Sequence, residues 1–389
     1  MPEALTASRS NHVCLGDVVA NVNDYFDRTT TDVYRYIAGD HIDEGSLTVR
    51  RWGETEDDTF PPTFNRRFRS GDVLFHSRNL RKLVRPTFAG VTGEKLFVLR
   101  VTRPDLLLPE LLPFLLQTRR FKEYVNRMWA GSTNKFLNKT PLMRYEFALP
   151  PIAEQWRLVS VLEAARELEE TIREALDHLV SVRESWLEHE FAMLERDWPV
   201  SFASDLMRRI TVGIVVRPAD LYVPKGRGVA ALRSLNVLPD KIVMDDVVHI
   251  SPKGHAEHRK SRLEAGDVVI VRSGRPGDAA VVPEDAVEMN CIDLIICSVG
   301  PQLLPHFVCA TVNSRFGRQQ FAAGIAGTAQ QHFNVGAFKN FRIPLPPMSV
   351  QAAFVARLQG SMQMLARTEQ RLASVRVLRS DLLKAVLET

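Results

Sequence analysis

The 389-residue sequence lacks the features that mark several classes of protein. It has no CxxC pair, and no cysteine has a histidine at a metal-binding spacing, so it indicates neither a zinc site nor a disulfide framework. The cysteines are interpreted as small buried hydrophobes in a reduced compartment: Cys14, Cys291, Cys297 and Cys309. No apolar run approaches the roughly 18 residues of a membrane span, and Met1 to Asn11 lacks an apolar segment of signal-peptide length. We therefore expect a cytoplasmic protein.

Catalytic motifs are also missing. Gly226-Arg227-Gly228 is an isolated GxG without the Lys-Ser/Thr pair of a phosphate-binding loop, and we interpret it as a turn. His249, His255 and His258 lie in a polar segment where no further ligand completes a metal site, which favours a solvated or phosphate-facing loop. No Ser/His/Asp or Cys/His set can be argued from spacing. The sequence therefore favours a binding role over catalysis and indicates no metal site.

An excess of charge of one sign is absent as well. Lysine and arginine number 50 against 46 aspartates and glutamates, a formal net charge of +4. A claim of nucleic-acid binding must therefore rest on where the basic residues lie and not on their total. A hydrophobic content of 45% with 25% charged residues is typical of a folded globular chain.

What the sequence does contain is a long internal repeat. Ala148-Leu149-Pro150-Pro151 precedes one long charged segment, and Pro344-Leu345-Pro346-Pro347 precedes another 196 positions later. Gly71-Asp72-Val73-Leu74-Phe75 matches Gly266-Asp267-Val268-Val269-Ile270 at a spacing of 195. The period is far longer than the roughly 20 to 50 residues of solenoid repeats, so it indicates a duplicated module.

The duplication predicts the domain organisation and the fold class. We expect two globular units, residues 1–150 and 197–346, and two helical segments, residues 151–196 and 347–389. Short apolar runs at 73–75, 95–99, 268–271, 280–282 and 294–297 predict strands, while helices are expected from Pro109 to Gly131 and after Pro305. Both units are therefore predicted to be α+β.

The two charged segments carry an apolar stripe with the three-four spacing of a coiled coil. In the first segment it comprises Leu158, Val161, Leu162, Ala165, Leu168, Ile172, Ala175, Leu176, Leu179, Val182 and Trp186. In the second it comprises Phe354, Leu358, Met362, Leu365, Leu372, Val375, Leu378, Leu382 and Val386. Each helix would have about 40 residues and a length of about 60 Å. Since such stripes need burial, we predict that the two helices pair as an antiparallel coiled coil.

The Leu-Pro-Pro corners suit helix starts. A proline is tolerated in the first helical turn, and the carboxylate of Glu154 meets the positive end of the helix dipole. The second corner has Val350 at the position equivalent to Glu154, but it keeps a glutamine, Gln351, at the position equivalent to Gln155.

A Leu-Pro-Pro-x-x-Glu-Gln corner opening a long helix, a Gly-Asp strand in each unit and the doubling of the whole resemble the specificity subunit of type I restriction-modification enzymes. In that family each unit is a target-recognition domain that reads one half of a split DNA sequence, and the helices form a spacer that docks methyltransferase subunits. The resemblance covers nearly the whole chain. The segment from His76 to Lys82 departs from the turn that the family has after its Gly-Asp strand, whereas Val271 to Gly277 looks like it.

The resemblance implies double-stranded DNA, two methyltransferase subunits and translocase/nuclease subunits as partners. S-adenosylmethionine and ATP with magnesium would bind those subunits and not this chain. The family's docking function carries over to the residues of the two corners: Pro150, Pro151, Glu154, Gln155, Pro346, Pro347 and Gln351.

Candidate DNA contacts are the basic residues of the loops, since arginine and lysine bind phosphates and arginine can address guanine with two donors. They are Arg50, Arg66, Arg67, Arg69, Arg78, Arg81 and Lys82 in the first unit, and Lys225, Arg227, Arg259, Lys260, Arg272 and Arg275 in the second. Further candidates follow the last helix of each unit: Asn134, Lys135, Gln330 and Gln331. Solvated surface charge and a helix-ending loop remain the alternatives.

Two other functions remain open. The chain could be a coiled-coil scaffold whose units bind proteins and never touch DNA, or an enzyme acting on nucleic acid through a site without a recognisable motif.

Overall fold

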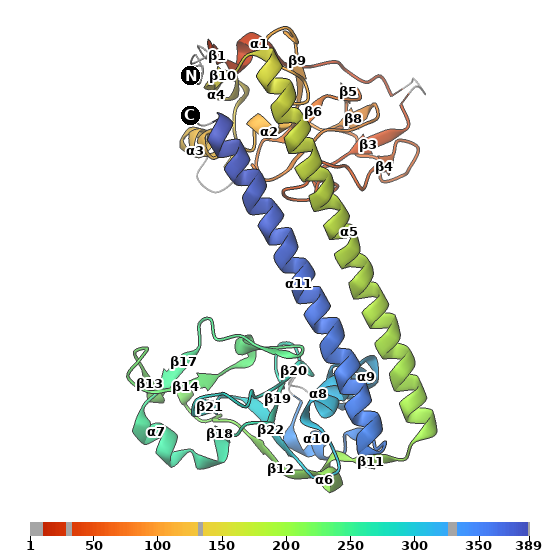
Figure 1. Cartoon of the computed structure of the whole chain (residues 1–389), viewed down its shortest axis with the longest axis vertical. Coiled ribbons are helices and arrows are strands. Elements are labelled where there is room, and N and C mark those ends of the chain that lie inside the picture. The colour runs from red at the N-terminus through yellow and green to blue at the C-terminus, as the bar shows by residue number, and fades with distance from the viewer. Residues whose placement is uncertain (1–10, 29–32, 131–134, 326–332, 388–389) are drawn as a thin grey trace, which may run out of the picture. The chain divides into compact units, whose positions relative to one another are not determined.

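The computed structural model describes residues 11–28, 33–130, 135–325 and 333–387. The chain divides into two compact units, Met1–Glu174 with Glu369–Thr389, and Ala175–Thr368. Each unit therefore contains one globular domain and one end of each of the two long helices (Figure 1).

The first domain is built from short strands and helices. In chain order these are β1 (Asn11–Cys14), α1 (Leu15–Val18), β2 (Val19–Asn21), β3 (Arg35–Ile37), β4 (Gly53–Glu54), β5 (Arg66–Phe68), β6 (Val73–His76), β7 (Leu83–Val84), β8 (Gly90–Thr92), β9 (Leu96–Val101), α2 (Leu112–Leu115), α3 (Arg119–Met128), α4 (Lys139–Met143) and β10 (Glu146–Leu149). The long helix α5 (Ile152–Asp197) follows.

The second domain begins directly after α5. Its elements are β11 (Val200–Phe202), α6 (Ala203–Leu206), β12 (Met207–Val212), η1 (Pro218–Leu221), β13 (Tyr222–Val223), β14 (Val229–Leu232), η2 (Ser234–Asn236), β15 (Val237–Leu238), β16 (Lys241–Ile242), β17 (Val248–Ile250), α7 (Pro252–Glu257), η3 (Arg259–Ser261), β18 (Arg262–Leu263), β19 (Val268–Val271), β20 (Ala279–Val281), β21 (Met289–Cys291), β22 (Leu294–Val299), α8 (Pro305–Asn313), α9 (Arg315–Ile325), α10 (Val335–Lys339) and β23 (Arg342–Pro344). The second long helix, α11 (Met348–Leu387), follows.

The two domains share one sheet plan. The four-stranded sheet β2-β9-β6-β7 has its counterpart in β12-β22-β19-β20. The sheet β4-β3-β8-β5 corresponds to β17-β14-β21-β18 in the second domain, and the parallel pair is β3·β8 in one and β14·β21 in the other. The second domain adds β13 at the edge and a hairpin of β15 and β16. The predicted duplication and α+β class are thereby confirmed.

The predicted Gly-Asp strands form as β6 and β19. Gly71 and Gly266 precede them at φ values of +87° and +80°, where a side chain would strain the backbone. The next residue in each copy, Asp72 or Asp267, is buried and accepts a hydrogen bond from the backbone N–H three residues earlier. This turn therefore depends on both residues of the Gly-Asp pair.

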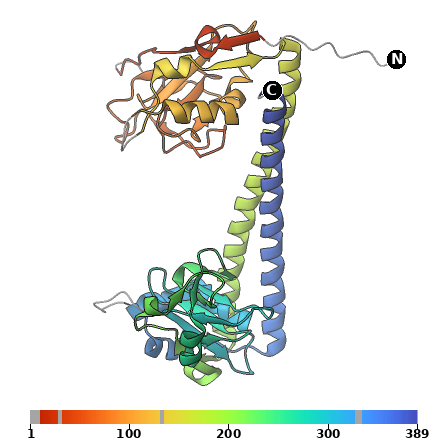
Figure 2. The ribbon, with the colours of Figure 1, turned by 90° about the vertical axis from the view of Figure 1, so that its left-hand side faces the viewer.

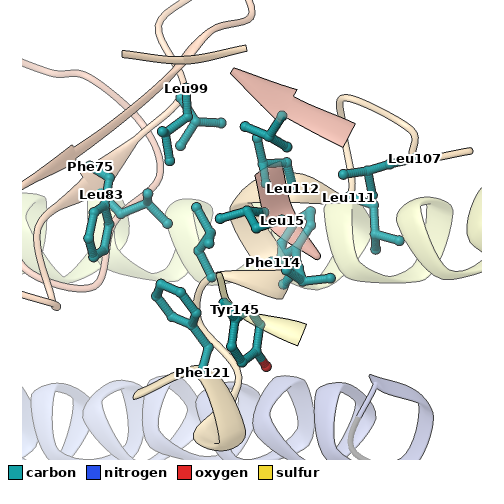
Figure 3. Packing of buried hydrophobic residues seen from close by; sticks show 14 of the residues in the cluster. Leu15, Phe75, Leu83, Leu99, Leu107, Leu111, Leu112, Phe114, Phe121 and Tyr145 are labelled. Atoms are coloured by element: carbon teal, nitrogen blue, oxygen red, sulfur yellow. The ribbon is translucent and has the colours of Figure 1, made fainter. Parts of the chain in front are cut away.

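One apolar core joins the first domain to the helices. Phe75 and Phe121 pack edge to face at 5.8 Å, and Phe121 meets Tyr145 at 5.0 Å (Figure 3). The same core cluster includes Leu162 of α5 and Leu383 of α11. In the second domain, Phe354 of α11 packs against Phe191 of α5 and Phe307 of α8: their ring centroids lie 5.4 and 5.5 Å from that of Phe354.

These contacts give the direction of helix pairing. The beginning of α5 packs with the end of α11 in the first unit, and the end of α5 packs with the beginning of α11 in the second (Figure 2). The predicted antiparallel pairing is confirmed within each unit.

The expected helix from Pro109 to Gly131 is wrong in its extent. Two helices, α2 and α3, occupy this segment, because Thr118 leaves the helical conformation and its hydroxyl accepts a hydrogen bond from the backbone N–H of Phe121. Thr118 is thus an N-cap that starts α3 anew. Gly131 lies outside the described residues.

The predicted apolar stripe is only partly correct. Leu162 and Ala165 are buried as expected, but Val161, Leu168 and Val182 are about half exposed. The residue buried next to Leu168 is Glu169, which is 3% exposed. An apolar pattern alone could not reveal a charged residue in the seam.

Glu169 is the centre of a polar layer between the helices of the first unit. Its carboxylate meets Arg173 of α5 at 3.2 Å and, from α11, Arg376 at 2.9 Å and Arg379 at 2.7 Å. Buried charged groups of this kind fix the register of a helix pair, since any shift leaves charges without partners.

Replacing Glu169 with alanine should destabilise the first unit. The change leaves two α11 arginines and Arg173 without their carboxylate, and we expect a loss of about 3 kcal/mol in unfolding free energy. Thermal unfolding of the full chain measures it, with Glu167→Gln on the exposed side of α5 as the control. Equal melting temperatures for Glu169→Ala and the parent chain would contradict the assignment.

Candidate nucleic-acid interface

The helix-opening corners have the same hydrogen bonds in both copies. The Gln155 side chain is fully buried; its Oε1 accepts from the Leu108 N–H at 2.9 Å, and its Nε2 donates to the carbonyls of Leu106 at 2.7 Å and Pro150 at 2.9 Å. Gln155 therefore ties the start of α5 to the segment after β9.

Gln351 makes the equivalent three bonds. Its Oε1 accepts from Leu304 N–H, and its Nε2 donates to the carbonyls of Gln302 and Pro346, all at 2.9 Å. Both glutamines face their own unit, and Pro346 is buried too, so these three of the residues predicted to dock partner subunits are not exposed in this chain. The exposed residues of the two corners are Pro151, Glu154 and Pro347, while Pro150 is half-buried.

Several basic residues of the first unit are bound internally. The Nε of Arg50 donates to Glu170 of α5 at 2.7 Å, the Nζ of Lys82 donates to the carbonyl of Gly39, and Arg81 pairs with Glu44 at 3.2 Å. The Arg50 side chain is about three-quarters buried, and its ion pair with Glu170 links the first domain to α5. Arg81 stays largely exposed.

Other predicted contacts of the first unit are more open. Arg66 and Arg67 belong to β5, and the Arg67 guanidinium lies over the Phe26 ring at 5.2 Å. Arg69, Arg78 and Lys135 are exposed. The candidates Asn134, Gln330 and Gln331 lie outside the described residues.

In the second unit the predicted residues form two groups. Lys225 and Arg227 are exposed on the turn between β13 and β14, and Arg259 and Lys260 are exposed on η3. The other two have internal partners. Arg272 meets Asp293 at 3.6 Å and is 18% exposed, and Arg275 pairs with Asp278 at 3.3 Å.

The structure also brings forward residues that the sequence reasoning missed. A cavity of about 390 Å³ beside Arg259 and Lys260 is lined by Val215 and Val216, which are 51% and 75% exposed. In the first unit Tyr25, Tyr34 and Trp52 are exposed, and the Arg35 guanidinium lies over the Trp52 ring. The alternation of aromatic and basic residues in Tyr34-Arg35-Tyr36 was the available signal.

The histidine segment is not the solvated loop that was expected. His255 is buried on α7, and its Nε2 lies 2.7 Å from the Glu288 carboxylate. Asn290 contacts its Nδ1 at 3.2 Å. The reason is that β21 and its flanking residues supply polar partners from a distant part of the sequence. Within the described ranges no group of three histidine, cysteine or acidic side chains could hold a metal ion.

The three cysteines of the second unit are buried, as expected. Burial raises the pKa of Cys291, Cys297 and Cys309 above the usual thiol range, so they stay protonated and unreactive. None of the described helices is both long and apolar enough to pass through a membrane.

A cavity of about 500 Å³ opens in the first domain between Gly39, Phe64, Lys82 and Lys95. His76 lines it, and burial, followed by the positive charges of Lys82, Lys95 and Arg78, lowers its pKa to about 4. The neutral ring accepts a hydrogen bond at Nδ1 from the Arg78 N–H at 3.0 Å.

Two related α+β domains, each fixed to one end of a shared antiparallel helix pair, define the class of fold. No protein-family model matches the sequence. No curated protein matches it either.

Solved structures do match over nearly the full length. One is a chain from a study of complex assembly and conformational transition in the type I restriction-modification system; it is 18% identical, covers 98% of both chains and has a TM-score of 0.61. Another is the S subunit of a type I restriction-modification system from M. genitalium; it is 12% identical, covers 99% of this chain and 98% of that one, and has a TM-score of 0.60. The chain therefore has the fold of type I specificity subunits, which confirms the resemblance at the level of fold.

The low pKa of His76 predicts an acid-sensitive first domain. The unfolded chain takes up a proton near the ordinary pKa of about 6.5, whereas the folded chain does so near 4, so stability is lost as the pH falls from about 6.5 to about 4. Urea unfolding at pH 7 and pH 5 should show a smaller loss for His76→Gln than for the parent chain. His306→Gln, at an exposed position, is the control and should behave like the parent. Parallel losses in all three proteins would contradict the prediction.

Proposed function

We propose that this chain is the DNA sequence-recognition subunit of a type I restriction-modification complex, with one half of a bipartite target read by each domain. The observation that carries the proposal is the contrast between the two copies. Sheets, Gly-Asp turns and glutamine corners agree, whereas the exposed basic and aromatic residues on the two domains differ. A common scaffold with divergent surfaces suits two domains that read different bases.

Phosphate contacts would supply most of the affinity. Exposed lysine and arginine side chains release condensed counterions from DNA, which makes binding weaken as salt rises. Arg69 and Arg78 in the first unit and Lys225, Arg227, Arg259 and Lys260 in the second are exposed and suit this role. Arg50, Arg272 and Arg275 are less suited, since carboxylates of the same chain bind them.

The helices would act as spacer and docking platform. Methyltransferase subunits would bind around them and use S-adenosylmethionine, and translocase/nuclease subunits would use ATP with magnesium. This chain would hold neither cofactor and catalyse no step. The exposed apolar side chains of α5, among them Val161, Leu168 and Val182, support a role in docking because large apolar groups on a helix surface favour protein contacts.

The alternatives differ in simple observations. A scaffold that binds only proteins would not shift duplex DNA in an electrophoretic assay, either alone or with its methyltransferase partner. If the chain were an enzyme with a site that has no recognisable motif, the isolated chain would turn over nucleic acid. The proposed function predicts no such turnover.

Reversing two charges on η3 tests the DNA-facing assignment. Because Arg259 and Lys260 would contact phosphates, changing both to glutamate should weaken duplex binding by about tenfold or more near 100 mM salt and make the slope of log K against log salt shallower by about 2. Titration at several salt concentrations measures both quantities.

The control must change the net charge equally. Arg103→Glu with Arg196→Glu does so at exposed positions that pair with a neighbouring aspartate. If the control weakens binding as much as the η3 variant, total charge and not placement would explain the loss.

Shortening both helices tests the spacer. Removing residues 175–181 from α5 and 362–368 from α11 deletes one heptad from each, keeps the three-four spacing and shortens the pair by about 10 Å. Since one turn of B-DNA advances about 34 to 36 Å in about 10 base pairs, the unread gap should shrink by about three base pairs.

Methylome sequencing of cells that carry the parent or the shortened chain gives the result directly. The parent should produce one split motif, and the variant should produce the same half-sites at a smaller separation. An unchanged separation of the two half-sites would contradict the role of the helices as a spacer. Absence of any methylated motif with the parent chain would contradict the proposed role in DNA recognition.

A further inference from the structure

Arg35 stands in an aromatic notch on the first domain. It is an exposed residue of β3, and its guanidinium carbon lies 4.7 Å from the Trp52 ring centroid and 4.9 Å from that of Phe88. The two rings meet edge to face, with centroids 5.6 Å apart and planes at 65°. The arginine is therefore held by two rings, one of which is itself 41% exposed.

This setting leaves the hydrogen-bonding edge of Arg35 available. Stacking on an aromatic face uses the plane of a guanidinium, while its N–H groups point outward in that plane. The side chain makes no hydrogen bond or ion pair with another residue in the described part of the chain, in contrast to Arg50 and Arg81, which meet carboxylates.

The strand position fixes Arg35 further. β3 is an inner strand that pairs with β4 on one side and β8 on the other. Arg35 is the first residue of β3 and is exposed, whereas Tyr36 and Ile37, which point to opposite faces of the strand, are both buried. A side chain on an inner strand varies less in position than one on a loop.

The second domain has different chemistry at the matching place. β14 has the same two kinds of neighbour as β3, an antiparallel strand and a parallel one. Its first two residues are Val229 and Ala230, which pair with Ile250 and His249. Among the described residues the arginine notch thus belongs to the first domain alone.

We propose that Arg35, held by Trp52 and Phe88, reads a guanine in the half-site of the first domain. The inference rests on the proposed function. A guanidinium edge can donate to O6 and N7 of guanine at once, and no other base offers this pair of acceptors in the major groove. Stacking lowers the entropy lost on binding, because the side chain is already in place.

Arg35→Lys tests the inference, since it keeps the charge and removes the planar pair of donors. The full chain is combined with its methyltransferase partner and challenged with a pool of duplexes randomised over the first half-site. We expect the preference for guanine at one position to fall by about tenfold, with the second half-site read as before and the salt slope unchanged.

Two further variants complete the design. Trp52→Leu should relax the same position, because it removes one face of the notch. Arg103→Lys, at an exposed position of the same unit that pairs with Asp105 and is not among the candidate DNA contacts, should leave the preference at every position intact.

The outcomes separate the inference from the function beneath it. A parent complex with a split motif and an Arg35→Lys complex with the identical motif would overturn the role of Arg35 alone. A uniform loss of affinity for all sequences would show a phosphate contact and would overturn it as well. A parent complex without any sequence preference would overturn the proposed function, and intact recognition of the other positions of the first half-site shows that the first domain of the variant is folded.

Discussion

The buried side-chain amide at the start of each long helix is the constraint on which the arrangement depends. Gln155 and Gln351 each connect the first turn of a helix to two backbone groups of the preceding domain and to a corner proline. Removing either would leave buried backbone groups without partners, each at a cost of about 1 to 3 kcal/mol. The start of each long helix is thereby held to the domain that precedes it in the chain.

The two copies keep an interaction while changing the residue that makes it. In the first unit, Arg100 of β9 pairs with Asp72 at 2.6 Å. In the second, Arg209 of β12 pairs with Asp267 at the same distance, and Ser298 of β22 donates to that carboxylate. β12 is the neighbour of β22 in the sheet, so the arginine has changed strands while the buried aspartate has stayed. The need for a cation beside a buried carboxylate is conserved between the copies, but the position of the cation is not.

Local patterns in the sequence were sufficient to predict much of the fold. Strands after the Gly-Asp pairs, the helix after Pro305 and the two long helices follow from apolar spacing and turn residues. The break at Thr118 required knowledge that its hydroxyl caps the next helix, and Glu169 in the helix seam required its partners on α11. Both depend on contacts that an apolar pattern does not record.

The candidate interface was harder to predict because exposure depends on distant partners. Arg50 lies in a basic run of the sequence, but its side chain binds a glutamate of α5. Arg35 lies in no such run, and its guanidinium stacks on the rings of Trp52 and Phe88. A search for basic runs therefore selected some arginines that are bound internally, and it did not select Arg35.

The polar layer at Glu169 also bears on self-association. Glu169 and Arg173 lie on α5, whereas Arg376 and Arg379 lie on α11, so pairing of α5 with α11 places arginines from both helices around one carboxylate. Pairing α11 with α11 would bring these arginines together without the carboxylate of Glu169. The layer thus favours pairing of α5 with α11 over pairing of α11 with a second copy of itself.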